Sequence, residues 1–484
     1  MTRPRSSRSS VPNARSLGLT HPKAQEDLQR LGWVDTQHAE QMWTLAATGD
    51  PDLALNNLIR LVEALDREES SGAATGTTAA ATGAGTSAEL LERIAESRTF
   101  AVRLLGLFGA SSMLGDHIVA NPAEWKHLEN GLPTAEEMMQ LMLDSVKATH
   151  VEGASQRIYR AGVTGSEADD AMRRTYRTIL ARIAAVDVAS TFVQRGQEPC
   201  DQAEFEVVAR RLSDAADAAL TAALGGGCGP GGGAAEPTPP PPVLAMGKCG
   251  AQELNYISDV DVIFVAEPAD PKATRWAGEF VNIGTRVFFE VDAALRPEGK
   301  SGALVRTLDS HVKYYNRWAE TWEFQAQLKA RPMTGDMELG QEYVDSLASL
   351  VWSAAEREDF VPDVQAMRRR VIENIPDELR ARELKLGPGG LRDIEFAVQL
   401  LQMVHGRTDE SLRTRSTVAS LDALAAGGYI GRADCRSLQE SYAYMRLLEH
   451  RLQLQRLKRT HALPPQEDKQ ALVSVSYTHL KLPT

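Results

Sequence analysis

Cysteine is scarce in this chain of 484 residues, and long apolar runs are missing. The 4 cysteines are scattered without a C-x-x-C pair, which predicts neither a disulfide framework nor a structural zinc site. No stretch approaches the roughly 18 consecutive apolar residues of a membrane span. The segment 1–15 is basic and serine-rich but lacks the apolar core of a secretory signal. We therefore expect a cytoplasmic protein with no membrane partner.

Basic residues are in deficit as well. Lys and Arg total 53 against 65 Asp and Glu, which gives a formal net charge of −12. Binding to nucleic acid normally rests on a basic surface that releases counterions from phosphates, so we expect no nucleic-acid partner. Two Arg/Lys-rich runs, at 366–392 and 446–459, are expected to be solvated faces of helices, and a local basic patch stays open as the alternative.

Apolar residues at helical spacing are abundant. Hydrophobic residues make up 43% of the chain, enough for more than one core. Their three-and-four spacing predicts amphipathic helices over 88–108 and 167–195. Low-complexity stretches at 70–87 and 225–242, rich in Gly and Ala with Thr, Ser or Pro, are expected to be flexible or extended inserts.

The spacing of apolar residues changes near residue 243. Short β-rich runs at 243–246, 260–265 and 288–295, with a helical stretch at 272–286, predict a small α/β unit. Helical periodicity returns after Tyr314. The expected division is a disordered tail at 1–23, a helical region at 24–115, a domain containing the α/β unit at 116–340, a helical bundle at 341–473 and an irregular, non-native tail at 474–484.

Two carboxylates stand at the start of the run at 260–265. Side chains alternate between the two faces of a strand, so Asp259 and Asp261 project together, ~7 Å apart. Val260, Val262 and Phe264 then face a core. Unpaired, the two acids would cost on the order of several kcal/mol through desolvation and repulsion. Hard divalent cations such as Mg²⁺ take oxygen ligands and would remove that cost, so the pattern predicts a metal clamp.

A glycine-containing turn precedes these acids. Gly247 and Gly250 flank Lys248, and a short helix is predicted over 251–256. Free backbone N–H groups at such a turn, with a lysine beside them, suit a phosphate. Alone, the two glycines would indicate an ordinary tight turn, and the acids that follow favour the phosphate interpretation. The Walker A pattern is absent because Cys249 follows the lysine, which argues against a P-loop ATPase.

A third carboxylate, Asp292, lies between apolar neighbours in the next β-rich run. Three acids on adjacent strands can hold two Mg²⁺ ions, which stabilise the attacking and leaving oxygens of an in-line displacement at phosphorus. Arg296 and Lys300 follow closely, and either they bind phosphate oxygens or they are surface cations.

Four sequence words carry a resemblance to a known family. They are GKxGxxELNYxSDxDxxF at 247–264, VDxxLRPxGxSG at 291–302, WExQxxxKAR at 322–331 and KLGPGGLRDIEF at 385–396. The first two follow the pattern of the polymerase-beta-like nucleotidyltransferase superfamily, and all four in this order resemble the glutamine synthetase adenylyltransferase family. The implied fold is α+β and predominantly helical, with a nucleotidyltransferase domain at 116–340 that holds a small mixed sheet and is flanked by helical domains.

The resemblance also implies a function. Members of the family carry two such units: the first removes AMP from a tyrosine of glutamine synthetase by phosphorolysis, and the second attaches it from ATP. One unit is visible here and resembles the first, so we expect a truncated adenylyl removase, an enzyme that consumes inorganic phosphate and releases ADP. A PII signalling protein as regulatory partner is implied by the resemblance alone.

Site roles carry over residue by residue as what the resemblance implies. The implied catalytic and metal-binding acids are Asp259, Asp261 and Asp292. The implied phosphate-side loop is Gly247, Lys248 and Ser258, with Arg331 at the rim of the nucleotide site.

Two other functions stay open at this point. The same fold can run the chemistry in reverse, transferring AMP or UMP to a protein. A catalytically silent helical module that binds PII is the other hypothesis, and the three intact acids argue against it because without an ion they would destabilise their sheet. We further expect Trp318, Trp322 and Phe324 to lie on one helix and to pack in a core.

Overall fold

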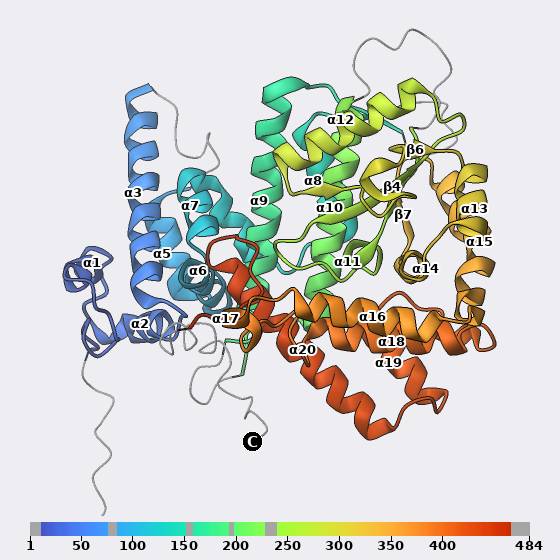
Figure 1. The fold of residues 1–484 in the computed structure, drawn as a ribbon. Helices are drawn as coiled ribbons and strands as arrows, with labels where there is room; N and C mark the ends of the chain where they lie inside the picture. Colours follow the sequence, from blue (N-terminus) through green and yellow to red (C-terminus); the bar gives the residue numbers. More distant parts are fainter. Residues whose placement is uncertain (1–10, 76–84, 152–157, 193–197, 228–239, 466–484) are drawn as a thin grey trace, which may run out of the picture.

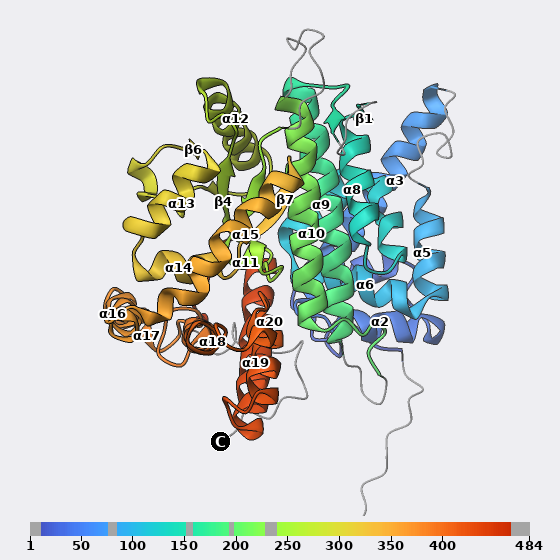
Figure 2. The same ribbon diagram turned by 90° about the vertical axis from the view of Figure 1, so that its right-hand side faces the viewer.

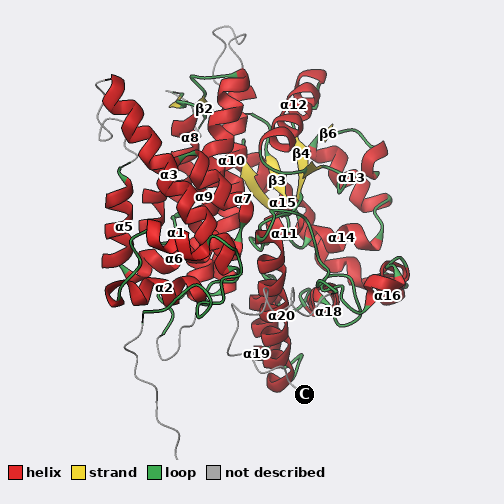
Figure 3. Ribbon diagram, turned by 90° about the vertical axis from the view of Figure 1, so that its left-hand side faces the viewer, coloured by secondary structure: helices red, strands yellow, loops and turns green. Residues whose placement is uncertain are grey.

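The computed structural model describes residues 11–75, 85–151, 158–192, 198–227 and 240–465. The expected tail at 474–484, residues 1–10 of the N-terminal tail and most of the stretch at 225–242 lie outside these ranges. Within the N-terminal tail, Leu17 and Leu19 are buried in the core, so residues 11–23 are ordered. Helices dominate the described part of the chain around one small mixed sheet (Figure 3), which confirms the α+β, predominantly helical fold class.

The N-terminal half is a stack of helices. Its elements are α1 (Ala24–Arg30), α2 (Ala39–Ala46), α3 (Pro51–Thr75), α5 (Ser87–Glu96), α6 (Arg98–Ala110), α7 (Ser112–Ala120), α8 (Ala135–Ser145), α9 (Gly165–Ser190) and α10 (Phe205–Gly227), with 3-10 turns at Thr36–His38 and Pro122–Glu129 and the short strand pair β1 (Thr149–His150) and β2 (Tyr159–Arg160). Helices α9 and α10 stand between the other N-terminal helices and the sheet (Figures 1 and 2). Their buried side chains join the two sides into one apolar core.

Helix boundaries in this half differ from expectation in two respects. The predicted helix at 88–108 is two helices, because Ser97 is extended and its side chain accepts the N–H of Phe100 as the N-cap of α6. Helix α3 continues to Thr75 and α10 to Gly227, so one end of each low-complexity stretch is helical.

A mixed sheet follows. Its strands and intervening elements are β3 (Val243–Ala245), α11 (Gly247–Gly250), β4 (Val260–Val265), α12 (Pro271–Val287), β5 (Val291–Asp292), a 3-10 turn (Gly299–Ser301), β6 (Val305–Arg306), α13 (Leu308–Arg317), α14 (Thr321–Gln327) and β7 (Arg331–Thr334). The strand order is β5-β4-β3-β7, with β6 also pairing with β4. Strand β3 is antiparallel to both neighbours, whereas β5 and β6 run parallel to β4.

Some local predictions in this unit were wrong. The strand at 260–265 is confirmed, but in the run at 288–295 only Val291–Asp292 pair with a neighbour. Residues 251–256 form turns and loop, and the short helix lies earlier, at Gly247–Gly250.

Strand β4 separates two cores by the alternation of its side chains. Val260, Val262 and Phe264 pack into the core shared with the N-terminal helices, as the sequence predicts. Ile263 and Val265 belong to the second core, beneath α13 and α15. The two acids at the start of β4 share the face of this second core but lie at its edge, where a cavity opens.

In Figure 1 the first of the C-terminal helices lies beside the sheet, and the later ones lie below it. The C-terminal helices are α15 (Met337–Ser353), α16 (Phe360–Glu373), α17 (Asp377–Arg380), α18 (Leu391–His405), α19 (Thr417–Ala426) and α20 (Arg432–Leu454), with 3-10 turns at Ala354–Glu356 and Glu410–Leu412. Within the described ranges, no helix combines the length and the apolarity needed to cross a bilayer.

The expectation for the aromatic residues near 320 was partly wrong. Trp318 is 72% exposed, because α13 ends at Arg317 and a separate helix, α14, begins only at Thr321. Phe324 in α14 is buried, as expected, and packs against Tyr315.

A buried ion pair ties α20 to the N-terminal half. Both terminal nitrogens of Arg451 donate to the carboxylate of Asp187 in α9, at 2.7 and 3.0 Å. The hydroxyl of Tyr256 donates to the same carboxylate at 2.8 Å. Removing one partner of such a buried pair typically costs about 3–5 kcal/mol, so this contact fixes α20 against the body of the protein.

Gly250 tests the close packing behind the sheet. A Cβ at this position would lie 1.9 Å from the carbonyl oxygen of Lys329 and 2.6 Å from that of Ala245. Because both neighbours are backbone, Gly250→Ala should lower the free energy of unfolding by about 1–3 kcal/mol, the usual cost of overpacking. Thermal unfolding followed by circular dichroism measures the effect.

The matched control is Gly278→Ala in α12. No atom lies within 4 Å of a Cβ built there, so the added methyl should be neutral or should stabilise the helix by roughly 0.5–1 kcal/mol. Equal melting temperatures for the two variants would contradict the packing described for Gly250.

Candidate active site

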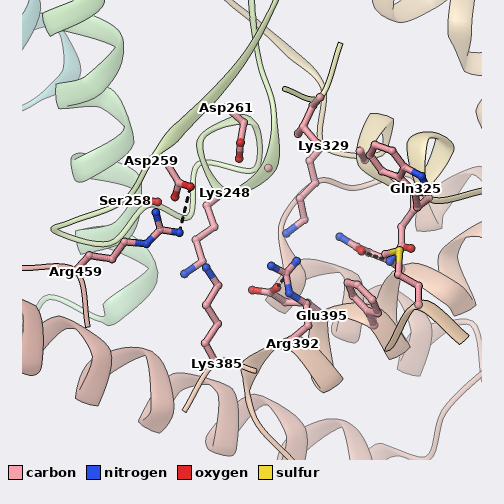
Figure 4. A pocket seen from close by; sticks show the side chains of 17 residues that line it. Lys248, Ser258, Asp259, Asp261, Gln325, Lys329, Lys385, Arg392, Glu395 and Arg459 are labelled. Carbon is pink, nitrogen blue, oxygen red and sulfur yellow. Dashed lines mark hydrogen bonds and ion pairs between the residues drawn. The ribbon is translucent and has the colours of Figure 1, made fainter. Parts of the chain in front are cut away.

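A cavity of about 320 Å³ lies between the sheet and the helices α16–α20 (Figure 4). This volume is in the range of roughly 300–1,000 Å³ that is usual for ligand pockets. Six parts of the chain line it: α11 with the start of β4, the loop after β5, α14 with the residues after it, α16, the loop before α18 with α18 itself, and the segment after α20. Its charged lining residues are Lys248, Asp259, Asp261, Lys329, Lys385, Arg392, Glu395 and Arg459.

One wall of the cavity is acidic. Asp261 is paired with Asp292 in the parallel register of β4 and β5, so both side chains project from the same face of the sheet. Asp259 immediately precedes β4 and lines the same cavity. Burial, together with the charges of Asp259 and Asp292, raises the pKa of Asp261 to about 7. The structure therefore brings the three predicted acids within electrostatic reach of one another.

Gly247 is required beside these acids. Its φ of +52° lies in the left-handed region, and a Cβ there would come within 2.7 Å of Oδ2 of Asp261. Any other residue would therefore strain the backbone and collide with the carboxylate. Glycine leaves a space next to the carboxylate that a ligand can occupy.

Lys248 is held in a buried ionic network. Its ammonium donates to Oδ1 of Asn255 at 3.1 Å and to the carboxylate of Glu449 at 3.2 and 3.3 Å. Glu449 is completely buried in α20 and also accepts from Arg446 at 2.8 Å and contacts Nδ1 of His461 at 3.0 Å. Burial lowers the pKa of Lys248, the charge of Arg446 lowers it further, and Glu449 raises it.

The opposite wall is built by the glycine-rich word at 385–396. Lys385, Arg392, Glu395 and Phe396 all line the cavity, and Figure 4 shows Lys385 extending toward Lys248. The glycine-rich turn thus lies across the cavity from the predicted phosphate side. Burial lowers the pKa of Lys385, and the neighbouring guanidinium of Arg392 adds to the effect.

Arg459, in the segment after α20, crosses to the acidic wall. Its Nη2 lies 3.2 Å from Oδ2 of Asp259, and its Nη1 lies 4.0 Å from Oε2 of Glu290. The side chain of Arg459 is 47% exposed, so this pair is weaker than the buried network around Glu449. The guanidinium of Arg459 therefore already supplies a positive charge beside the acidic wall.

The donor set suits a hard divalent cation. Asp259, Asp261 and Asp292 supply only carboxylate oxygens, and a cation would stabilise the ionised form of Asp261, which burial and the two acidic neighbours disfavour. The space beside Gly247 leaves Oδ2 of Asp261 accessible. In the part of the chain that the structure describes, no three acidic, histidine or cysteine side chains are already closed around one point as metal ligands. Loading would therefore require a rearrangement of these side chains, including the release of Asp259 by Arg459.

Three of the predicted phosphate ligands lie outside the cavity. The guanidinium of Arg296 donates to the carbonyls of Ala293, Lys300 and Gly302 and so braces its own loop. Lys300 is exposed in that loop. Arg331 makes a two-pronged pair with Asp217 at 2.8 and 2.9 Å on the α10 side of the sheet. None of these three lines the cavity, whereas Ser258 does.

Most of the cationic wall of the cavity, which is formed by Lys385, Arg392 and Arg459, was not predicted from the sequence. The Arg/Lys-rich runs at 366–392 and 446–459, expected to be solvated, supply Lys385, Arg392 and Arg459 to the cavity and the buried Arg446 to the network behind it. A signal existed only for the first run, which overlaps the glycine-rich word. Glu449, on the other hand, meets Lys248 across 201 positions of sequence, a pairing that no local pattern indicates.

Comparison with known proteins adds two family matches. Residues 101–345 match the family model described as Glutamate-ammonia ligase adenylyltransferase. Residues 365–478 match the model described as GlnD PII-uridylyltransferase. The first match contains the whole sheet and its acids, and the second contains most of the cationic wall.

Similar curated proteins share one name, bifunctional glutamine synthetase adenylyltransferase/adenylyl-removing enzyme. The protein of Corynebacterium glutamicum is 54% identical over 96% of this chain and 44% of its own length. Those of Nocardia farcinica and Mycobacterium tuberculosis are 52% and 48% identical over 98% and 96% of the chain. The chain spans less than half the length of these relatives, 45% and 44% in the last two cases. It belongs to the glutamate-ammonia ligase adenylyltransferase family.

Proposed function

We propose that this chain removes AMP from an adenylylated tyrosine of glutamine synthetase by Mg²⁺-dependent phosphorolysis and releases ADP. The observation that carries the proposal is the meeting of an acidic strand edge with a cationic wall in one cavity. The relatives' shared name supports the substrate, since it includes both the adenylyl-removing and the adenylyltransferase activity. The word at 385–396 and the helical region before the sheet resemble the removing unit.

The reaction is a displacement at phosphorus. An oxygen of inorganic phosphate attacks the phosphorus of the tyrosyl-AMP ester, the bond from phosphorus to the tyrosine oxygen breaks, and that oxygen gains a proton. The products are ADP and unmodified tyrosine. Asp259, Asp261 and Asp292 would hold Mg²⁺, which would stabilise charge on the attacking and leaving oxygens.

The chain's own residues position the reactants. Gly247 leaves room for the phosphoryl group beside Asp261. Lys248 is fixed by Asn255 and Glu449, so it contributes a positive potential from a set position. Such preorganised charge lowers the barrier without reorganisation during the reaction.

A second candidate function is the transfer of AMP from ATP to the synthetase, because the relatives' name includes it and the fold permits either direction. A PII-type protein as partner of the helical domain is supported only by the name of the model that matches residues 365–478.

Product analysis distinguishes the two directions. The purified chain is incubated with adenylylated glutamine synthetase, inorganic phosphate and Mg²⁺, and in parallel with unmodified synthetase, ATP and Mg²⁺. We expect ADP in the first mixture and no pyrophosphate in the second. Pyrophosphate without ADP would instead assign the chain to transfer.

The acids can be tested one charge at a time. Asp261→Asn and Asp259→Asn keep the side-chain volume but should lower the phosphorolysis rate on the order of a hundredfold or more. Because the charge removed at Asp261 is repelled by its acidic neighbours, its variant should melt at the same or a higher temperature without Mg²⁺. The control is Asp359→Asn, an exposed carboxylate before α16. Full activity in either site variant would refute the assignment.

Arg459 gives a metal-specific prediction. Its guanidinium competes with a divalent cation for Asp259, so Arg459→Ala should lower the Mg²⁺ concentration that half-saturates the thermal shift of the protein without substrates. Arg459→Lys retains a competing charge and should stay closer to the parent. An unchanged or increased Mg²⁺ requirement in Arg459→Ala would show that the pair does not restrict the metal site.

A further inference from the structure

We propose that Lys385 and Arg392 form the binding site for the inorganic phosphate that attacks in the reaction. This inference rests on the proposed function, because it assigns one of that reaction's two substrates to two side chains. The site lies on the wall of the cavity opposite the acids, and both residues line it. No motif for phosphate, such as a Walker A loop, includes them.

The partners of the cavity's cations single out this pair. Lys248 is neutralised by Glu449, Lys329 donates to Glu253 at 3.2 Å, and Arg459 faces Asp259. By contrast, among the described residues no hydrogen bond or ion pair is made by the ammonium of Lys385.

Arg392 is only loosely engaged. Its nearest acid is Glu395, at 3.8 Å, beyond hydrogen-bond distance, and its guanidinium lies over the ring of Phe396 at 5.3 Å. A guanidinium in this state keeps donors for a second ligand, and two of them match two phosphate oxygens. Lys385 adds a compact charge beside it.

The backbone holds the two residues side by side. The N–H of Arg392 donates to the carbonyl of Lys385 at 2.9 Å, and the N–H of Leu391 donates to the carbonyl of Leu384 at 2.9 Å. These two bonds close the glycine-rich loop at its base. The spacing between the two cations is therefore set by the backbone and not by flexible side chains alone.

The loop between them is built to stay in this shape. A Cβ at Gly387 or Gly390 would lie 2.4 or 2.6 Å from a backbone carbonyl oxygen, and Gly389 has a φ of +74°. Arg368 donates to the carbonyls of Leu386 and Gly387, each at 3.0 Å, and pairs with Asp393. A rigid loop that presents two cations to a cavity costs little ordering entropy when an anion binds.

Charge favours a phosphate dianion on this wall and not beside the acids. Glu395 is the acid that lines the cavity near the pair, whereas Asp259 and Asp261 lie across from it. A dianion at the pair would face the metal-binding acids with cations on its own side. This is the placement that a nucleophile needs to approach phosphorus held at the opposite wall.

Equilibrium dialysis with labelled inorganic phosphate, without nucleotide or protein substrate, tests the site directly. We expect Lys385→Ala and Arg392→Ala each to bind phosphate about tenfold or more weakly, the loss typical of a charge-assisted contact. Lys385→Arg should recover most of the affinity. Arg370→Ala, an exposed cation of the same basic run on α16, is the matched control and should bind like the parent.

Steady-state kinetics provide the second readout. In the two alanine variants the KM for phosphate should rise about tenfold or more, while the KM for adenylylated synthetase stays within about twofold of the parent. Unchanged dialysis and unchanged KM for phosphate would overturn the inference. Weaker binding of AMP with normal binding of phosphate would also overturn it, because the cations would then serve the nucleotide.

The inference and the proposed function fail in different ways. If the parent chain produces no ADP but binds phosphate through Lys385 and Arg392, the phosphate site stands and the proposed reaction is wrong. If the parent produces ADP and both variants retain its KM for phosphate, the reaction stands and the site is wrong. Circular dichroism of each variant confirms that the loop substitutions leave the fold intact.

Discussion

The repulsion among three carboxylates at one edge of a buried sheet is the constraint on which the site depends. Asp261 cannot ionise freely where it lies, since burial and two acidic neighbours oppose its charge. Positive charges from outside the sheet oppose this effect. Lys385 and Arg392 lower the pKa of Asp261, which the acidic neighbours raise, and Arg459 contacts Asp259. The acidic edge and the cationic wall are thus two halves of one electrostatic arrangement.

The cavity is therefore formed jointly by the sheet and the C-terminal helices. The strands supply the acids, but the charges opposite them come from the loop before α18 and from the segment after α20. The network of Lys248, Glu449 and Arg446 locks the two parts together, and Arg446 also donates to the carbonyls of Glu253 and Leu254 behind α11. A sheet domain without the C-terminal helices would leave its acids and Lys248 without these partners.

Local features of the fold could be predicted from the sequence because their causes are local. The alternation at 260–265 predicts the strand, its core-facing residues and the common face of Asp259 and Asp261, and the glycine beside them has a steric reason within the same motif. Whether the charged residues face water or the cavity could not be predicted, because a basic run has the same sequence pattern in both cases. Arg331 illustrates the opposite case, a cation in a familiar word that pairs with Asp217 on the far side of the sheet.

Exposure distinguishes the contacts that hold the site from those that can change. Glu449 and Arg446 are fully buried, and opening their pair would strand charges in a medium that cannot solvate them. Arg459 and Asp259 retain 47% and 26% of their side-chain exposure, so water can take over when they part. Ligands that need the acidic wall therefore compete with the segment after α20 and not with α20 itself. Ligands can therefore bind at the acidic wall while the buried pair of Glu449 and Arg446 stays intact.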